Sequence, residues 1–380
     1  MVKKDTTGAS SHTKKRISRG RPLRIGYVPL TDCAPLLVAK EMNFFDRHDL
    51  LVELSPEPGW ATVREKMVHG ELDAAHAPAS MVFEMSHGWG CLPTAVQTAL
   101  VTAHHGNAIA LSRGLWEEGV RDVHSLRELV LAEKGKRRFT FAGVLQFSSQ
   151  NYLLRKWLRS GGLVPDRDVD MAIVPPPLVF RCLQKGHLDG YCVAEPFTSI
   201  GIFKKVAWAV ELSSRLDPFH PEKVFLVRES FAREREEEHL ALVAALIEAC
   251  RWCDDPMNRG ELIPLLANSQ NLALDESVVA NALGDDFDLG QGRRLPEPQT
   301  IFYGGPDQGR PRLNKARWVL DQILINRFVP ESFNELDSAL AKYFREDFFE
   351  RALGLVSGSN ELNKPEGRAN SSAMPAKASR

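Results

Sequence analysis

Short apolar runs alternate with segments of helical periodicity along the chain. Residues 23–28 form one such run, which ends at Pro29 and predicts a strand. Residues 34–43 have helical spacing, with Pro35 where the first turn of a helix tolerates proline. We expect further strands at 50–54, 92–100, 139–142, 170–174 and 223–227, and further helices at 61–68, 81–88, 125–133, 151–160, 236–253 and 315–325. This order indicates βαβ units, and therefore an α/β protein with a largely parallel sheet.

One turn sequence occurs twice, each time between a predicted helix and a predicted strand. Gly70 and Gly186 stand where a helix ends in a left-handed residue, and each is followed by x-Leu-Asp and small residues. Such a turn is common, so coincidence is the simpler interpretation. The alternative is one copy in each of two similar lobes, whose equivalent strand ends face a common cleft. Proteins of that architecture bind small ligands between the lobes.

The overall charge argues against some classes of partner. The formal net charge is −1 at pH 7, so the composition favours neither nucleic acid nor an anionic membrane. No apolar run approaches the roughly 20 residues that span a bilayer. The six cysteines are scattered among apolar residues, which favours buried thiols over a disulfide framework. The pair Cys250 and Cys253 lies within a predicted helix and is interpreted as structural.

The sequence offers no motif for catalysis, a metal or a cofactor. A phosphate-binding loop of the form G-x-x-x-x-G-K-[ST] is missing, which argues against an ATPase. His69, His76 and His87 lack the spacing of metal ligands. We therefore expect neither an enzyme nor a metal or cofactor site.

The two ends of the chain differ in composition from the rest. Residues 1–21 are polar and basic, and no apolar segment as long as that of a secretory signal follows them. This pattern predicts a disordered basic tail and a cytoplasmic protein. Residues 357–380 are rich in Ser, Asn, Lys, Ala and Pro, and predict a second disordered tail. Between the tails we expect the first part of lobe 1 at 22–107, lobe 2 at 108–222, and the completion of lobe 1 with C-terminal helices at 223–356.

Eight short motifs, in this order and spacing, resemble one known family. They are LTDCAPL at 30–36, GWA at 59–61, GELDAAH at 70–76, HGNAI at 105–109, QNYLLR at 150–155, VPPP at 174–177, DGYCVAEP at 189–196 and HPEKV at 220–224. The family comprises the nitrate- and bicarbonate-binding proteins of ABC transporters and the cytoplasmic nitrate sensors of the NasS type. The resemblance covers residues 23–345. It implies a two-lobed, periplasmic-binding-protein-like fold with a ligand cleft between the lobes and a helical C-terminal part.

The same resemblance implies an anion in the cleft, in contact with Trp60, His105, Gln150, the backbone at Ala194, and Lys223. Nitrate is planar and singly charged, so a buried site needs one cation and several N–H donors. Lys223 would supply the charge, and the other residues hydrogen bonds or a flat apolar wall. By itself, Lys223 would be interpreted as a solvated lysine and Trp60 as a packing residue. Gln150 replaces a histidine of the family pattern and Ala194 a glycine, which leaves the identity of the anion open.

Three functions are compatible with this resemblance. We expect a cytoplasmic sensor of nitrate or nitrite, which holds an RNA-binding antiterminator of the ANTAR type inactive and releases it when the anion binds. The sensor itself would contact neither nucleic acid nor membrane. The alternative is the substrate-binding component of a nitrate, bicarbonate or sulfonate ABC importer, which would require export. A pyridoxal-phosphate-dependent pyrimidine synthase of thiamine biosynthesis ranks last, because the cysteine-rich motif of that enzyme is missing.

Overall fold

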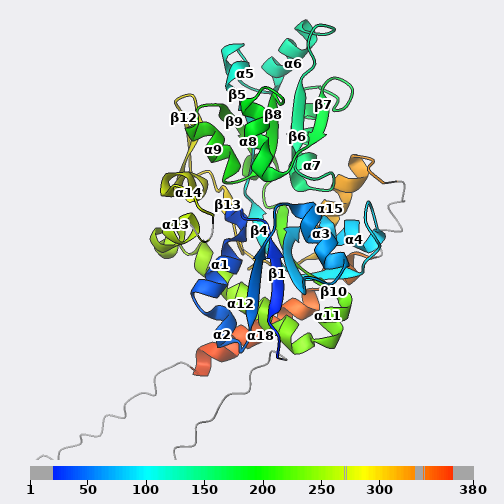
Figure 1. Ribbon diagram of the computed structural model, residues 1–380, viewed down its shortest axis with the longest axis vertical. Coiled ribbons are helices and arrows are strands. Elements are labelled where there is room, and N and C mark those ends of the chain that lie inside the picture. The colour runs from blue at the N-terminus through cyan, green and yellow to red at the C-terminus, as the bar shows by residue number, and fades with distance from the viewer. Residues whose placement is uncertain (1–19, 269, 271, 330–336, 338, 363–380) are drawn as a thin grey trace, which may run out of the picture.

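Two lobes, each built on its own β-sheet, form the described part of the protein (Figure 1). The computed structural model describes residues 20–268, 270, 272–329, 337 and 339–362, with 357–362 described by their backbone only. Lobe 1, with the blue strands, lies below lobe 2, with the green strands (Figure 1). The predicted two-lobed α/β architecture is therefore confirmed.

The sheet of lobe 1 has six strands in the order β13-β4-β10-β3-β1-β2. Their bounds are β1 Leu23–Tyr27, β2 Val52–Pro56, β3 Ala74–Pro78, β4 Val96–His105, β10 Pro221–Arg228 and β13 Ile301–Phe302. β1 pairs in parallel with β2 and β3, as the βαβ pattern predicts. β10 lies antiparallel between β3 and β4, so the sheet is mixed rather than largely parallel.

The sheet of lobe 2 repeats this plan with five strands in the order β7-β6-β8-β5-β9. Their bounds are β5 Asn107–Ser112, β6 Thr140–Gly143, β7 Asp170–Ile173, β8 Gly190–Ala194 and β9 Ala207–Leu212. β6 pairs in parallel with β7 and β8, and β5 lies antiparallel between β8 and β9. In each sheet, three parallel strands thus lie beside one antiparallel strand, which is β10 in lobe 1 and β5 in lobe 2. The chain enters that strand from the other lobe.

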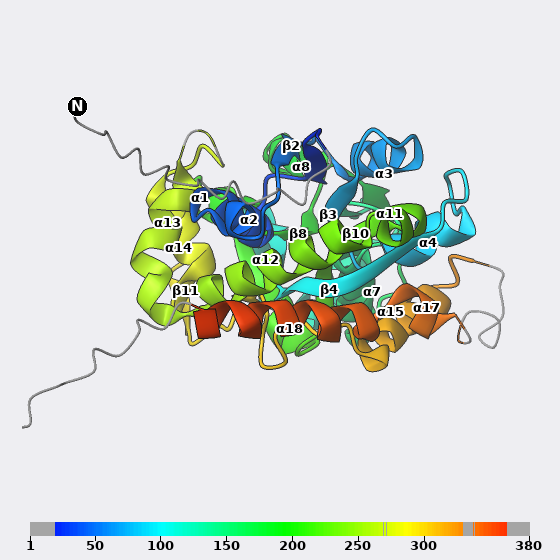
Figure 2. The ribbon, with the colours of Figure 1, turned by 90° about the horizontal axis from the view of Figure 1, so that it is seen from below.

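Helices cover both faces of each sheet. Those associated with lobe 1 are α1 Ala34–Glu41, α2 Phe44–Arg47, α3 Trp60–Val68, α4 Met81–His87, α11 Glu229–Glu234, α12 Glu236–Asp254, α13 Arg259–Ala267, α15 Leu313–Ile325, α17 Leu340–Tyr343 and α18 Glu346–Leu362. Those of lobe 2 are α5 Arg113–Glu117, α6 Val123–Ala132, α7 Ser149–Ser160, α8 Pro176–Gln184, α9 Phe197–Phe203 and α10 Ser213–Leu216. α12 and α18 lie side by side beneath lobe 1 (Figure 2) and share one apolar core with α1 and β1.

The repeated turn has the same geometry in both lobes. Gly70 and Gly186 follow α3 and α8 with φ of 73° and 74°, the left-handed region that a residue with a Cβ adopts only at a cost. Leu72 and Leu188, two residues later, are buried. Each turn then leads into the third parallel strand of its own sheet, β3 or β8. The interpretation of one copy per lobe is confirmed.

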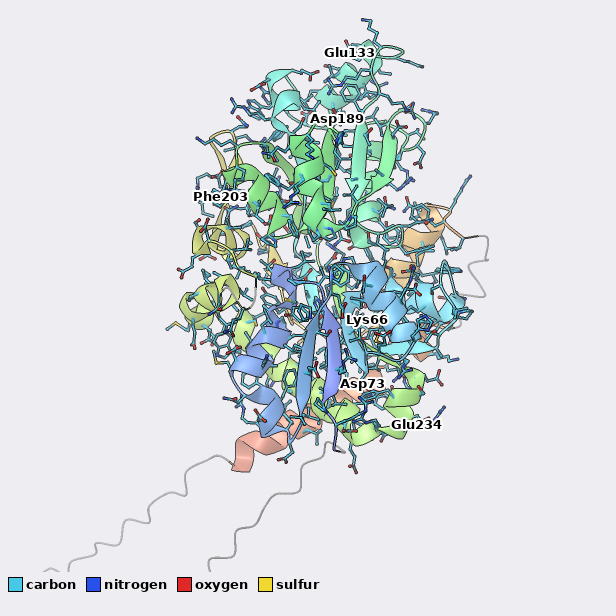
Figure 3. The ribbon with its side chains drawn as sticks, in the orientation of Figure 1. Lys66, Asp73, Glu133, Asp189, Phe203 and Glu234 are labelled. Carbon is cyan, nitrogen blue, oxygen red and sulfur yellow. The ribbon has the colours of Figure 1, made fainter. Side chains whose placement is uncertain are left out.

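An aspartate joins each of these strands to its parallel neighbour. Oδ2 of Asp73 accepts a 2.9 Å hydrogen bond from the backbone N of Arg24 in β1, and Oδ2 of Asp189 accepts a 2.8 Å bond from the backbone N of Thr140 in β6. Figure 3 shows Asp73 toward the lower end of lobe 1 and Asp189 toward the upper end of lobe 2. β3 and β8 therefore begin far from each other, and both run toward the interface between the lobes.

Three expected boundaries differ from the structure. The segment with α14 (Glu276–Leu283) and the hairpin β11 (Asp286–Gly290) and β12 (Arg293–Pro296) packs on α9 and β9 of lobe 2, although 223–356 was assigned to lobe 1. Buried Phe287 explains this placement, because it joins an apolar cluster with strands β5 and β9. Arg21, assigned to a disordered tail, forms a 2.7 Å ion pair with Asp73. Residues 357–362 continue α18, while 1–19 and 363–380 lie outside the described residues.

Candidate functional site

Buried polar side chains gather where β3 and β8 reach the interface between the lobes. Strand β10 begins here and carries Glu222 and Lys223, with Lys223 opposite the last residue of β3. Asp32 comes from the short 3₁₀ turn that precedes α1, and Gln150 from the first turn of α7. All four side chains belong to residues with 0% exposure. Segments from both lobes therefore build one site.

Lys223 lies between two carboxylates. Its Nζ is 2.8 Å from Oδ2 of Asp32 and 2.5 Å from Oε1 of Glu222, and it lies 5.2 Å from the centre of the Trp60 ring. Burial by itself lowers the pKa of a lysine, but the two carboxylates outweigh it and raise the pKa of Lys223 above its usual value. Lys223 is therefore charged, and its charge is already compensated.

Glu222 is the best satisfied group of the cluster. Its Oε1 accepts a 2.8 Å hydrogen bond from Nε2 of Gln150, and its Oε2 accepts a 2.5 Å bond from Nδ2 of Asn107 and another from Oγ of Ser149. Burial raises the pKa of a carboxyl group, but the charge of Lys223 and the contact with His220, whose Nε2 lies 3.4 Å from Oε2, lower that of Glu222 to about 2. Glu222 is therefore ionised and has little capacity for another donor.

Asp32 has fewer partners. Apart from Lys223, the nearest titratable contact is His76, whose Nε2 lies 4.0 Å from Oδ1 of Asp32. Oδ1 accepts no hydrogen bond from any described residue. Burial raises the pKa of Asp32 to about 6, and Lys223 offsets only part of that effect. Burial and the charge of Lys223 lower the pKa of His76 to about 3, so this ring is neutral at pH 7.

The two walls of the site are in direct contact. The backbone N and the Oγ1 of Thr31 both donate to the carbonyl O of Glu195, each at 3.0 Å, and thereby connect the turn before α1 to the end of β8. Oγ of Ser80 donates to the carbonyl O of Phe147 at 2.5 Å, which makes a second contact between the lobes. The structure is therefore a closed form, and a ligand would enter the site only after the lobes separate.

The structure brings four of the five sequence-predicted residues to this site. Gln150 and Lys223 both contact Glu222. Trp60 is the first residue of α3, and its buried indole Nε1 has no hydrogen-bond acceptor among the described residues. Ala194 is the last residue of β8 and lies opposite Asn107 in the sheet register.

His105 is turned toward the connections between the lobes instead. Its Nε2 accepts a hydrogen bond from the backbone N of Phe219, and its Nδ1 lies 3.3 Å from the carbonyl O of Gln299. Both ring nitrogens are therefore engaged by the backbone. The motif HGNAI, which contains His105, contributes a different side chain to the cluster. This is Asn107, which donates to Glu222.

Sequence reasoning missed the carboxylates and the neighbouring polar residues of the site. Asp32 and Glu222 stand inside the motifs LTDCAPL and HPEKV, and Ser149 directly precedes QNYLLR. Polar residues inside buried motifs are a usable signal, because buried polar groups need partners. His76, which lies 4.0 Å from Asp32, has buried ring nitrogens without a hydrogen-bond partner among the described residues and is a donor available to a ligand.

An apolar groove of about 460 Å³ lies next to Trp60, between the two lobes. It is lined by Pro58, Gly59, Trp60, Ala61, Thr62, Val144, Leu145, Ile173, Pro175, Pro176, Pro177 and Leu178. Trp60 thus separates this groove from the charged cluster, since its ring also faces Lys223.

The described residues contain no group of three or more His, Cys, Asp or Glu side chains suited to a metal ion. Across the same described ranges, no helix is both long and apolar enough to cross a bilayer.

Comparisons with known proteins place the chain in a family. The NrtC nitrate import ATP-binding protein of Synechocystis is 38% identical over 306 residues, which cover 79% of this chain and 45% of that protein. The bicarbonate-binding protein CmpA of Synechococcus is 26% identical over 75% of this chain and 65% of its own length. The chain therefore spans less than two thirds of either relative.

The fold matches that of a solved binding protein. The periplasmic nitrate-binding protein NrtA from Synechocystis PCC 6803 superposes with a TM-score of 0.84, at 22% identity and with 90% of each chain covered. At this identity the likeness concerns the fold alone. The sequence model of the NMT1-like family, however, matches residues 18–267, which is more than half of the chain. This protein therefore belongs to the NMT1-like family, and it is similar to proteins named for the binding or transport of nitrate and bicarbonate.

Proposed function

We propose that this protein is a cytoplasmic sensor of nitrate or nitrite that binds the anion between its lobes and controls an ANTAR-type antiterminator. One observation carries the proposal: a buried, charged lysine lies at the closed interface of two similar lobes, beside unpartnered N–H groups. Lys223 supplies the cation, and Trp60 and His76 supply donors. A planar oxyanion has the size and the acceptors that such a site can hold.

Closure of the lobes is the step that can carry a signal. An anion that touches Lys223 from one lobe and Gln150 from the other binds the closed form more tightly than the open form. The ligand can shift the equilibrium only by this difference in affinity. A partner that recognises the open arrangement of the two lobes would consequently be released when the anion binds.

The similarity to NrtC supports a location inside the cell. NrtC is named an ATP-binding protein, and ATP is an intracellular nucleotide. This chain shares 38% identity with a stretch of NrtC and contains no phosphate-binding loop itself. A domain of this kind that works beside an ATP-binding domain would sense an anion in the cytoplasm.

The alternative is the substrate-binding component of a nitrate, bicarbonate or sulfonate importer. The similarity to CmpA and the NrtA-like fold favour it as much as they favour a sensor. The two functions differ in location and partner. An importer component would be found outside the cytoplasmic membrane and would bind a permease, whereas a sensor would be cytosolic and would bind the antiterminator.

The test combines thermal unfolding with a pull-down. Nitrate, nitrite, bicarbonate and an alkanesulfonate are added separately to the purified protein at pH 6, with chloride at equal ionic strength as the control. A ligand at about 100 times its Kd stabilises the native state by about 2.7 kcal/mol, so the true ligand raises Tm. The co-expressed antiterminator is then captured on the immobilised protein with and without that ligand.

Each outcome separates the hypotheses. Nitrate or nitrite should raise Tm and release the antiterminator, and cell fractionation should find the protein in the cytosol. Stabilisation by bicarbonate or a sulfonate alone would contradict the assignment of the ligand. Recovery of the protein from a periplasmic fraction, together with failure to capture the antiterminator, would favour the importer.

A further inference from the structure

The charges of the site do not balance for an anion ligand. Among the described residues, Lys223 is the one cation within ion-pair distance of both Asp32 and Glu222. His220 also belongs to this cluster, because its Nε2 lies 3.4 Å from Oε2 of Glu222. If both carboxylates are ionised and the His220 ring is neutral, the cluster carries a formal charge of −1 before any ligand arrives. A monoanion would raise this to −2 inside a site with 0% exposure, where uncompensated charge is very costly.

We infer that Asp32 is a specificity-determining residue, whose carboxylate competes with the ligand for Lys223 so that an anion binds only together with one proton. This inference rests on the proposed binding of an oxyanion in the cleft. The carboxylate of Asp32 already occupies the position of an anion: it is planar, carries one negative charge and lies 2.8 Å from Nζ of Lys223. A ligand oxygen near Nζ replaces it, and the displaced carboxylate takes up the proton.

Asp32, rather than Glu222, is the group that accepts this proton. Glu222 holds donors from Gln150, Asn107, Ser149 and Lys223, so protonation would break established hydrogen bonds. Oδ1 of Asp32 has no hydrogen-bond partner among the described residues and can carry a hydrogen without losing one. A protonated Asp32 then becomes a donor, and it can bond an oxygen of the bound anion.

The described surroundings of Asp32 add no second cation at neutral pH. From β10 it faces Lys223 and Glu222, and from β3 it faces His76. Cys33 follows it in the same 3₁₀ turn, and Tyr303 donates its hydroxyl to the carbonyl O of the preceding Thr31. Burial raises the pKa of Cys33 and of Tyr303, and lowers that of His76, so these three groups are neutral.

Asp32 would discriminate between oxyanions that have an O–H group and oxyanions that have none. Nitrate has acceptors only, so its binding requires a proton on Asp32. Bicarbonate has an O–H group that can donate to the ionised carboxylate of Asp32, and it can bind without a proton from solvent. At pH 8 the cleft should therefore prefer an oxyanion that carries its own hydrogen.

The pH dependence has a definite sign. Below about pH 6 the carboxyl group of Asp32 is already protonated in the free protein, and nitrate affinity should not change with pH. Above this pH each bound nitrate must bring one proton, so its Kd should rise by about tenfold per pH unit. At pH 8, two units higher, nitrate should bind about 100-fold more weakly than at pH 6.

Isothermal titration calorimetry with nitrate tests this pH dependence, because nitrate itself does not change its protonation between about pH 6 and about pH 8. Titrations at pH 8 in buffers of different ionisation enthalpy should show uptake of about one proton per nitrate. Asp32→Asn removes the negative charge and leaves Lys223 paired with Glu222. This variant should bind nitrate without proton uptake, with a Kd that stays constant from about pH 6 to about pH 8. At pH 8 it should bind about 100-fold more tightly than the unmodified protein.

A matched control uses another buried carboxyl group that is paired with a cation. Glu84 lies 2.5 Å from Arg64, and burial raises its pKa to about 7. Glu84→Gln should keep the proton uptake and the pH dependence of the unmodified protein. Glu195, whose pKa burial raises to about 7, is the rival proton acceptor, and Glu195→Gln should likewise keep the uptake.

Several results would overturn the inference while leaving the proposed function standing. These are nitrate binding without proton uptake, loss of uptake in Glu195→Gln but not in Asp32→Asn, and weaker nitrate binding by a folded Asp32→Asn variant. Failure of every variant to bind nitrate, nitrite or bicarbonate at any pH would instead refute the proposed function. Bicarbonate titrated at pH 8 should bind the unmodified protein without proton uptake.

Discussion

Replacing Lys223 by methionine tests the buried charge cluster most directly. Methionine keeps much of the apolar stem of lysine but removes the charge. Asp32 and Glu222 then lose the cation that they share, in a site with 0% exposure. Removal of one partner from a buried ion pair costs about 3–5 kcal/mol, because the remaining charge is uncompensated. Native proteins are stable by only about 5–15 kcal/mol, so Lys223→Met should lose a large part of the free energy of unfolding.

Two further variants show whether the loss comes from the carboxylates. Lys156 forms a 2.7 Å ion pair with Asp217, but its side chain is 45% exposed. Lys156→Met should therefore cost about 0–1 kcal/mol, as exposed ion pairs do. Adding Asp32→Asn to Lys223→Met should recover part of the loss, because it removes one of the two unpaired charges while Glu222 keeps its donors.

The assay is urea unfolding at pH 8, monitored by tryptophan fluorescence. It compares the unmodified protein with Lys156→Met, Lys223→Met, Asp32→Asn and the double variant that combines Lys223→Met with Asp32→Asn. We expect Lys223→Met to unfold at a much lower urea concentration than Lys156→Met, and the double variant to lie between them. Equal midpoints for Lys223→Met and Lys156→Met would show that the charges are not buried together as described. A double variant less stable than Lys223→Met would refute the argument that Lys223→Met leaves an excess of negative charge on Asp32 and Glu222.

Two smaller changes examine how the lobes are joined. Gln150→His can keep one donor toward Glu222 and should keep nitrate affinity within about tenfold. Gln150→Leu removes one of the two donors to Oε1 of Glu222 and the donor to Oδ1 of Asn107, and should lower the free energy of unfolding by about 1–3 kcal/mol in urea unfolding. Thr31→Val removes one of two hydrogen bonds to the carbonyl O of Glu195, worth about 1 kcal/mol, and should weaken nitrate binding about fivefold in calorimetry at pH 6. Unchanged affinity in Thr31→Val would show that this contact does not hold the closed form.

Local sequence patterns located most elements and the repeated turn. The expected helix at 151–160 and strand at 170–174 match α7 and β7 to within two residues at each end. Gly70 and Gly186 were identified because a left-handed residue after a helix is a local requirement. Local patterns did not reveal the hairpin β11–β12, since its place on lobe 2 depends on the contact of Phe287 with a distant sheet.

The family motifs led to the region of the site but not to its charge. Trp60, Gln150, Ala194 and Lys223 lie around the cleft, as the resemblance implied. His105 does not face Lys223, because both of its ring nitrogens are engaged by backbone groups from other segments. The periodicity of a sequence cannot show which polar groups share a hydrogen bond across the chain.

The sequence by itself therefore determined the α/β class and the repeated turn, because periodicity, turns and helix ends depend on residues near one another in the chain. The segments that reach the cleft came from the family resemblance of its motifs. Only the tertiary structure decided that Lys223 is held by Asp32 and Glu222, and that Gln150 joins the lobes through Glu222. Charges from segments far apart in the sequence meet within lobe 1, and their burial then sets the protonation of Asp32.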